Sequence, residues 1–100
     1  MKKSEKYKFL LPIVRACVMQ NKYVFTEHAK LRMRERGILK ADVMYVLLYG
    51  FHEKTKDTFH NTNYAWSYAI RGKSEDARDI RVIVSFEANC LFLITVIEIK

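Results

Sequence analysis

A period of two governs the stretch Ile80-Arg81-Val82-Ile83-Val84-Ser85-Phe86-Glu87. Its even-numbered positions are all apolar, whereas its odd-numbered positions are mixed, which is typical of a β-strand with one buried face. Residues 91–99 are apolar on both alternating faces and predict a central strand. The dipeptide Ala88-Asn89 between the two runs predicts a tight hairpin.

Two further strands are expected between Gly50 and this hairpin. Residues 51–59 alternate charged residues with others and predict a solvated edge strand. Residues 60–63 predict a turn, and in residues 64–70 every second side chain is large and apolar or aromatic. A loop is expected over residues 72–76, and the strand of residues 80–87 follows it. The sheet is therefore expected to be four-stranded and antiparallel.

Helical spacing governs the residues before Gly50. Apolar positions repeat at this spacing from 7 to 21, and a second helix is expected over 27–36, with Thr26 as its N-cap and Gly37 as its left-handed stop. A third helix is expected over 40–49. Helices followed by strands indicate an α+β fold, with two or three N-terminal helices packed on the four-stranded sheet. We expect one domain over 1–100, with a helical part at 5–50 and a sheet part at 51–100.

The composition favours a soluble chain with a polyanionic partner. Eighteen Lys and Arg against eleven Asp and Glu give a net charge of +7. Charged residues interrupt every apolar segment, so we expect no membrane span, and no apolar signal core follows the basic N-terminus. Cys17 and Cys90 lie among apolar residues and suit buried thiols in a reducing compartment. These features predict a cytoplasmic protein.

The second helix carries the densest group of chemically useful side chains. His28, Arg32 and either Glu35 or Arg36 follow at steps of three and four and share one stripe. Imidazole exchanges protons near neutral pH, and guanidinium grips phosphate through two hydrogen bonds, so the stripe suits binding or cleaving a phosphodiester. The alternative is that Arg32 and Glu35 form a solvated helix pair and His28 caps the helix start.

An aromatic row in the sheet supplies a second candidate. Trp66 and Tyr68 share one face of their strand, close in sequence to Arg71, Arg78 and Arg81. Aromatic rings beside Arg can stack bases and neutralise phosphate, but such a row is also typical of the inner face of a sheet under helices. Arg81 lies mid-strand and therefore needs a partner or a ligand. We find no Gly-rich phosphate loop and no metal-ligand spacing, and expect neither cofactor nor metal.

The motif His28-Ala29-x-x-Arg32-Met33-x-x-Arg36-Gly37-Ile38-x-x-x-Asp42-Val43, with a late Ile94-Thr95-Val96, resembles the domain of unknown function 4258 family. The resemblance covers roughly residues 24–97 and implies a fold similar to the RelE, BrnT and barnase-like ribonuclease toxins. It also implies an antitoxin partner and metal-independent cleavage of RNA, with His28, Arg32, Arg36 and Thr95 at the matching positions. Leu39 departs from the pattern, because it stands where a Ser or Thr N-cap is usual and leaves Asp42 without its capping-box partner.

The leading hypothesis is a toxin-type, metal-independent endoribonuclease that acts on RNA, free or on the ribosome. His28 is expected to transfer the proton, and Arg32, Arg36 and Arg81 are expected to hold the phosphate. The expected further substrate contacts are Trp66, Tyr68, Arg71, Arg78 and Thr95. The alternative is a non-enzymatic basic module that binds nucleic acid or an acidic protein, and a third reading is a toxin-like fold without activity.

Overall fold

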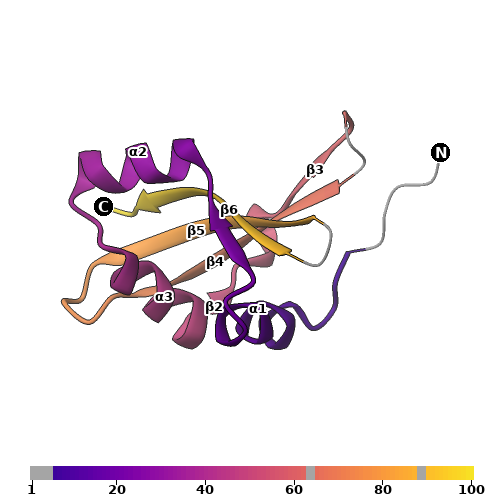
Figure 1. The fold of residues 1–100 in the computed structure, drawn as a ribbon, viewed down its shortest axis with the longest axis horizontal. Coiled ribbons are helices and arrows are strands. Elements are labelled where there is room, and N and C mark those ends of the chain that lie inside the picture. Colours follow the sequence, from indigo (N-terminus) through magenta and orange to yellow (C-terminus); the bar gives the residue numbers. More distant parts are fainter. Residues whose placement is uncertain (1–5, 63–64, 88–89) are drawn as a thin grey trace.

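The computed structural model describes residues 6–62, 65–87 and 90–100 (Figure 1). Three helices and a 3-10 turn alternate with short and long strands in these ranges. In chain order the elements are α1 (Leu10–Met19), β1 (Tyr23–Phe25), α2 (Glu27–Arg36), α3 (Lys40–Tyr49), β2 (Phe51–His52), the 3-10 turn η1 (Lys54–Lys56), β3 (Thr58–His60), β4 (Ala65–Lys73), β5 (Asp79–Glu87) and β6 (Cys90–Glu98). The predicted α+β class is confirmed, and the predicted bounds of α2 and α3 agree with the structure.

The sheet has more strands than the sequence predicts. Its order is β1-β6-β5-β4-β2, with β3 also paired to β4, so the described part of the chain holds six strands instead of four. β1 runs parallel to β6, and the other pairs are antiparallel. β1 also separates α1 from α2, so the helices do not form one N-terminal block. β1 has only three residues, which is too short to display a period of two, so the sequence pattern did not predict it.

The single edge strand predicted over residues 51–59 is wrong. The segment divides into β2, η1 and β3, because its backbone and side chains bind β4 around a turn. The Glu53 N–H donates to the Ala69 carbonyl at 2.8 Å, and the Ala69 N–H donates to the Asp57 carboxylate at 2.9 Å. The predicted hairpin at Ala88-Asn89 and the predicted strand position Tyr64 lie outside the described residues.

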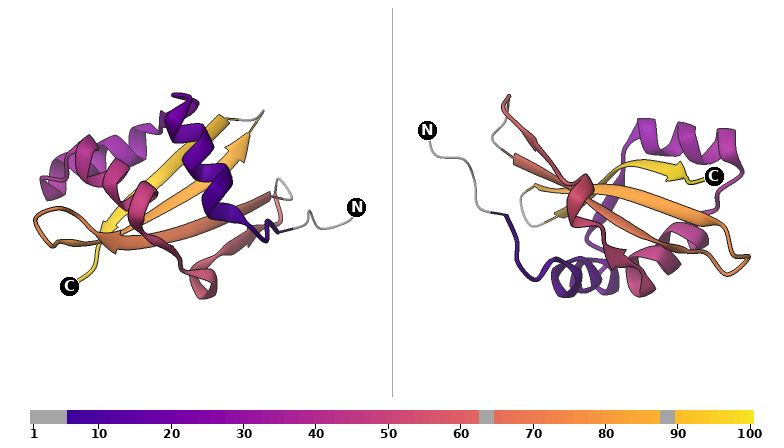
Figure 2. Two further views of the ribbon diagram at one scale, coloured as in Figure 1. Left: turned by 90° about the horizontal axis from the view of Figure 1, so that it is seen from below. Right: turned by 180° about the vertical axis from the view of Figure 1, so that it is seen from behind.

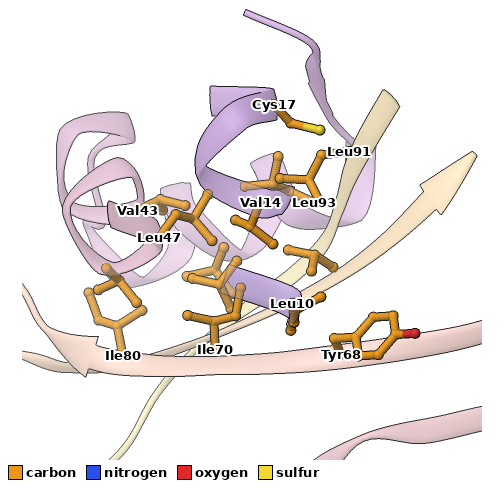
Figure 3. Close-up of a cluster of buried hydrophobic side chains, with 14 of the residues drawn as sticks. Leu10, Val14, Cys17, Val43, Leu47, Tyr68, Ile70, Ile80, Leu91 and Leu93 are labelled. Atoms are coloured by element: carbon orange, nitrogen blue, oxygen red, sulfur yellow. The ribbon is translucent and has the colours of Figure 1, made fainter. Parts of the chain in front are cut away.

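α1 and α3 cover one face of the sheet (Figure 2, left). The even-numbered residues of β5 from Ile80 to Val84 are buried on this face, which confirms the predicted alternation. Figure 3 shows how helix residues such as Val14 and Leu47 meet Ile70 of β4 in the core. β6 lies between β1 and β5, as its two apolar faces predict.

The end of α3 lies directly on β4 at Gly50. A Cβ atom at this residue would lie 2.5 Å from the Val46 carbonyl oxygen and 2.6 Å from the Arg71 carbonyl oxygen. Only glycine fits such a distance. α3 begins at Lys40 although Leu39 offers no capping side chain, because the Leu39 N–H donates to the Asp42 carboxylate at 2.9 Å.

The opposite face of the sheet carries the side chains of the alternate residues. In the β4–β5–β6 register Arg71, Arg81 and Ile97 form one row, and Ala69, Ile83 and Thr95 form the next. α2 packs along β6 at the border of this face (Figure 1). The candidate site is built at this border.

Candidate functional site

The first turn of α2 is fastened to β6 by Thr26. Its Oγ1 accepts the Ala29 N–H at 3.2 Å, which confirms the predicted N-cap. The same hydroxyl lies 3.0 Å from the Leu93 carbonyl oxygen and 2.9 Å from the Ile94 carbonyl oxygen, to which it donates. The cap therefore comes from Thr26 and not from His28, whose side chain is left for other contacts.

The last turn of α2 is fastened to the sheet by Arg78. Gly37 ends the helix in the left-handed region at φ 62°, as predicted. The Arg78 guanidinium donates to the carbonyl oxygens of Gly37 at 2.8 Å and Arg36 at 2.6 Å. It also pairs with Glu98 at 2.9 Å. Arg78 therefore connects the C-terminal end of α2 to β6, and its expected contact with a substrate stays a prediction.

A groove runs between the two fastened ends of α2 and the second half of β6. His28, Arg32 and Arg36 line its helical wall, and residues 95–98 line its strand wall. All three helix residues are exposed, and the groove volume is about 340 Å³. A spacing of four residues puts successive members of the stripe about 6 Å apart along the helix axis. The groove therefore presents an imidazole and two guanidinium groups in line.

Two carboxylates modify the charge of this groove. Arg32 lies 3.6 Å from Glu35, and both side chains are about half exposed. This is the solvated pair that the sequence offered as an alternative, and at this exposure it holds Arg32 only weakly. Glu98 closes the far end, and the hydrogen bond from Arg78 lowers the pKa of its carboxyl group. Among the residues that line the groove, two guanidinium groups, those of Arg32 and Arg36, stand against one carboxylate, that of Glu98.

A charged network lies beside the groove on the same face of the sheet. Arg81, which pairs across the strands with the groove residue Ile97, donates Nε to Glu53 at 2.6 Å. Arg71 donates to Glu53 at 3.1 Å and to Asp79 at 2.7 Å. The hydrogen bond from Arg81 lowers the pKa of Glu53, and the bonds to Asp79 and Glu53 raise the pKa of Arg71. Arg81 thus has the partner that a mid-sheet Arg requires.

Sequence reasoning missed Glu53. Glu53 lies in a segment that was predicted as a solvated edge strand, where a single carboxylate does not indicate a functional or structural role. Its role depends on the pairing of Phe51 with Arg71, which places the next residues of the chain over the Arg71–Arg81 pair. Only the register of β2 on β4 could have shown this contact.

Residues 25–98 match the family model described as "Domain of unknown function (DUF4258)". The chain belongs to the DUF4258 family. Comparison with curated proteins and with solved structures finds no match. The DUF4258 match contains every residue of the groove and of the charged network. α1 precedes the match, yet Leu10, Val14 and Cys17 lie in the core.

The aromatic row of the DUF4258 region lies on the side of the sheet that the helices cover. Tyr68 is only 2% exposed, and its hydroxyl oxygen accepts the Tyr7 N–H at 3.0 Å. Burial raises the pKa of this phenol. Trp66 packs against the same core, with its ring 5.4 Å from the Phe59 ring. The inner-face interpretation therefore fits both residues, and neither lies beside the groove.

The other two histidines of the DUF4258 region make local contacts. His52 Nε2 lies 2.6 Å from the buried Asp57 carboxylate, which Lys6 also contacts at 2.8 Å. His60 Nε2 lies 2.7 Å from Ser67 Oγ. These pairs join the η1–β3 segment to its neighbours.

Within the described ranges no helix is long and apolar enough to cross a membrane.

Proposed function

We propose that the chain is a toxin-type endoribonuclease that holds single-stranded RNA in the α2–β6 groove and cleaves it without a metal ion. The observation that carries this proposal is the placement of His28, Arg32 and Arg36 on one exposed stripe, with Thr95 on the facing strand. A fold relationship to the RelE and barnase-like ribonucleases and an inhibitory antitoxin partner belong to the same proposal.

The groove offers the chemistry that an RNA backbone needs. Its guanidinium groups can each hold a phosphate through two hydrogen bonds, and they follow one another at a spacing comparable to successive phosphates of an extended strand. Ile97 is 40% exposed on the strand wall and supplies apolar surface for a sugar or a base. The net charge of +7 adds long-range attraction.

His28 would transfer the proton. Its neutral imidazole accepts the proton of the ribose 2′-hydroxyl while the 2′-oxygen attacks phosphorus, and the bond from phosphorus to the 5′-oxygen breaks. The imidazolium then returns the proton to the leaving 5′-oxygen, so the products are a 2′,3′-cyclic phosphate and a 5′-hydroxyl. Arg32, one turn along the helix, stabilises the charge that develops on the phosphoryl oxygens.

A second candidate function is binding of RNA without cleavage. The engagement of Arg81 by Glu53 favours it, because a paired guanidinium is less available to a phosphate. Such a module would bind RNA in a salt-dependent manner and release it intact.

Induced expression in a bacterial host tests the proposal. We expect the wild type to arrest growth and deplete total RNA, and the Arg32→Ala/Arg36→Ala variant to do neither. Lys54→Ala/Lys56→Ala is the matched control, since it removes two exposed charges from η1, which lies between β2 and β3 and does not line the groove, and it should behave like the wild type. Normal growth with intact RNA for the folded wild type would favour the binding module.

A further inference from the structure

The other flank of α2 carries a second groove of different character. It lies between α2, the end of β1 and the start of α3, and has a volume of about 520 Å³. Apolar side chains form its floor and cationic side chains form its rim. The floor residues are Phe25, Met33 and Ile38, the exposed Leu39 lies beside them, and the rim residues are Lys30, Arg34 and Lys40.

Leu39 makes this groove apolar at a cost to the helix that it precedes. It occupies the N-cap position of α3, where Ser, Thr, Asp or Asn would stabilise the helix, and its side chain is 68% exposed. Ile38 beside it is only 4% exposed and forms the base of the depression. An apolar side chain at a capping position, next to an apolar depression, indicates a surface that is covered by a partner.

The cationic rim determines the charge of that partner. Lys30 lies 3.4 Å from Glu27 in an exposed pair, and the Lys40 ammonium lies 5.2 Å from the Tyr23 ring, so both remain at the surface. Arg34 is also exposed. Three cations around an apolar floor complement a segment with apolar residues on one side and carboxylates beside them.

From this complementarity we infer that the groove binds an acidic amphipathic helix of a partner protein. Leu-like side chains at helical spacing enter the floor, and flanking Asp or Glu side chains pair with Lys30, Arg34 and Lys40. A recessed floor favours inserted side chains over a flat lipid surface. The inference does not depend on RNA cleavage, because Lys30 and Arg34 lie on the flank of α2 opposite to Arg32 and Arg36, and Lys40 lies at the start of α3.

Fluorescence anisotropy with a designed peptide tests the inference. The probe is a labelled helix of about 16 residues with Leu on one face and Glu on the other. We expect Lys30→Glu/Arg34→Glu to weaken binding by about tenfold or more, and Leu39→Ser to weaken it severalfold. The control Lys54→Glu/Lys56→Glu makes the same charge change away from the groove and should bind within about twofold of the wild type.

Several results would overturn the inference. A peptide of the same composition with its Leu residues scattered around the helix must bind much more weakly, or the attraction is only electrostatic. If Lys54→Glu/Lys56→Glu weakens peptide binding as much as Lys30→Glu/Arg34→Glu does, the attraction is likewise only electrostatic. Loss of RNA binding or of binding to anionic vesicles in Lys30→Glu/Arg34→Glu, with peptide binding unchanged, would assign the groove to RNA or lipid instead. Circular dichroism of each variant verifies folding.

Discussion

At the residue scale, His28 and Glu53 show which side chains a sequence can reveal. His28 belongs to a helix whose spacing places it beside Arg32 and Arg36, so its neighbours could be predicted from local geometry. Glu53 contacts Arg71 and Arg81 from a different strand, and no local pattern relates these positions. The contacts of Arg78 with Arg36, Gly37 and Glu98 likewise arise only in the fold, so the sequence did not predict them.

Substitution of Glu53 tests the charged network through the pH dependence of stability. The pKa values of Glu53 and Asp79 are lowered in the folded state, by Arg81 and Arg71 respectively. Their contribution is therefore fully present above the unfolded pKa values of about 4 and is lost as the pH falls through the lower folded values. We expect Glu53→Gln to lower the unfolding free energy by about 1–2 kcal/mol at neutral pH and by less in acid. Urea unfolding from neutral pH down to acid measures this, and a pH-independent difference would contradict it.

At the element scale, α2 and α3 could be predicted because their signals are local. Thr26 and Gly37 act through neighbouring backbone, so their presence in the sequence is enough to bound α2. β1 and the break at η1 depend on partners far along the chain. Tyr23 and Phe25 are held in a strand by β6, and the turn around η1 is held by Ala69 of β4.

Substitutions at Gly50 and Gly37 compare the cost of a steric overlap with the cost of a strained backbone conformation. At Gly50 a Cβ atom would overlap the carbonyl oxygens of Val46 and Arg71, whereas at Gly37 nothing lies within 4 Å and only the left-handed φ of 62° opposes a side chain. We expect Gly37→Ala to cost about 1 kcal/mol of unfolding free energy and Gly50→Ala about 2–4 kcal/mol, because α3 must move from β4. Chemical denaturation of both variants measures the difference, and equal losses would show that the contact at Gly50 is relaxed easily.

At the scale of the whole molecule, the two faces of the sheet differ in character. α1 and α3 bury one face, and the other carries the charged network beside the α2–β6 groove. The net charge and the α+β class could be predicted from composition and periodicity. The concentration of cations at both flanks of α2 could not, because it needs the position of the helix on the sheet.

The salt dependence of RNA binding tests whether the groove contacts phosphates. The logarithm of the binding constant should fall linearly with the logarithm of salt concentration, with a slope of about −0.7 for each phosphate neutralised on a single strand. Arg32→Ala/Arg36→Ala should therefore reduce the slope by about 1.4, whereas Lys54→Ala/Lys56→Ala should leave it unchanged. Filter binding or anisotropy over a salt series gives both slopes, and an unchanged slope in the groove variant would place the RNA elsewhere.

The most direct test of RNA cleavage in the α2–β6 groove is the fate of a labelled single-stranded RNA incubated with purified protein in EDTA. We expect the wild type and Lys54→Ala/Lys56→Ala to produce fragments that end in 2′,3′-cyclic phosphate and begin with 5′-hydroxyl. Folded His28→Ala should lose about a hundredfold or more in rate, because the proton-transfer group is gone. Cleavage by His28→Ala at the wild-type rate would show that His28 does not transfer the proton, and RNA that binds the groove of the folded wild type but stays intact would show that the protein is not a ribonuclease.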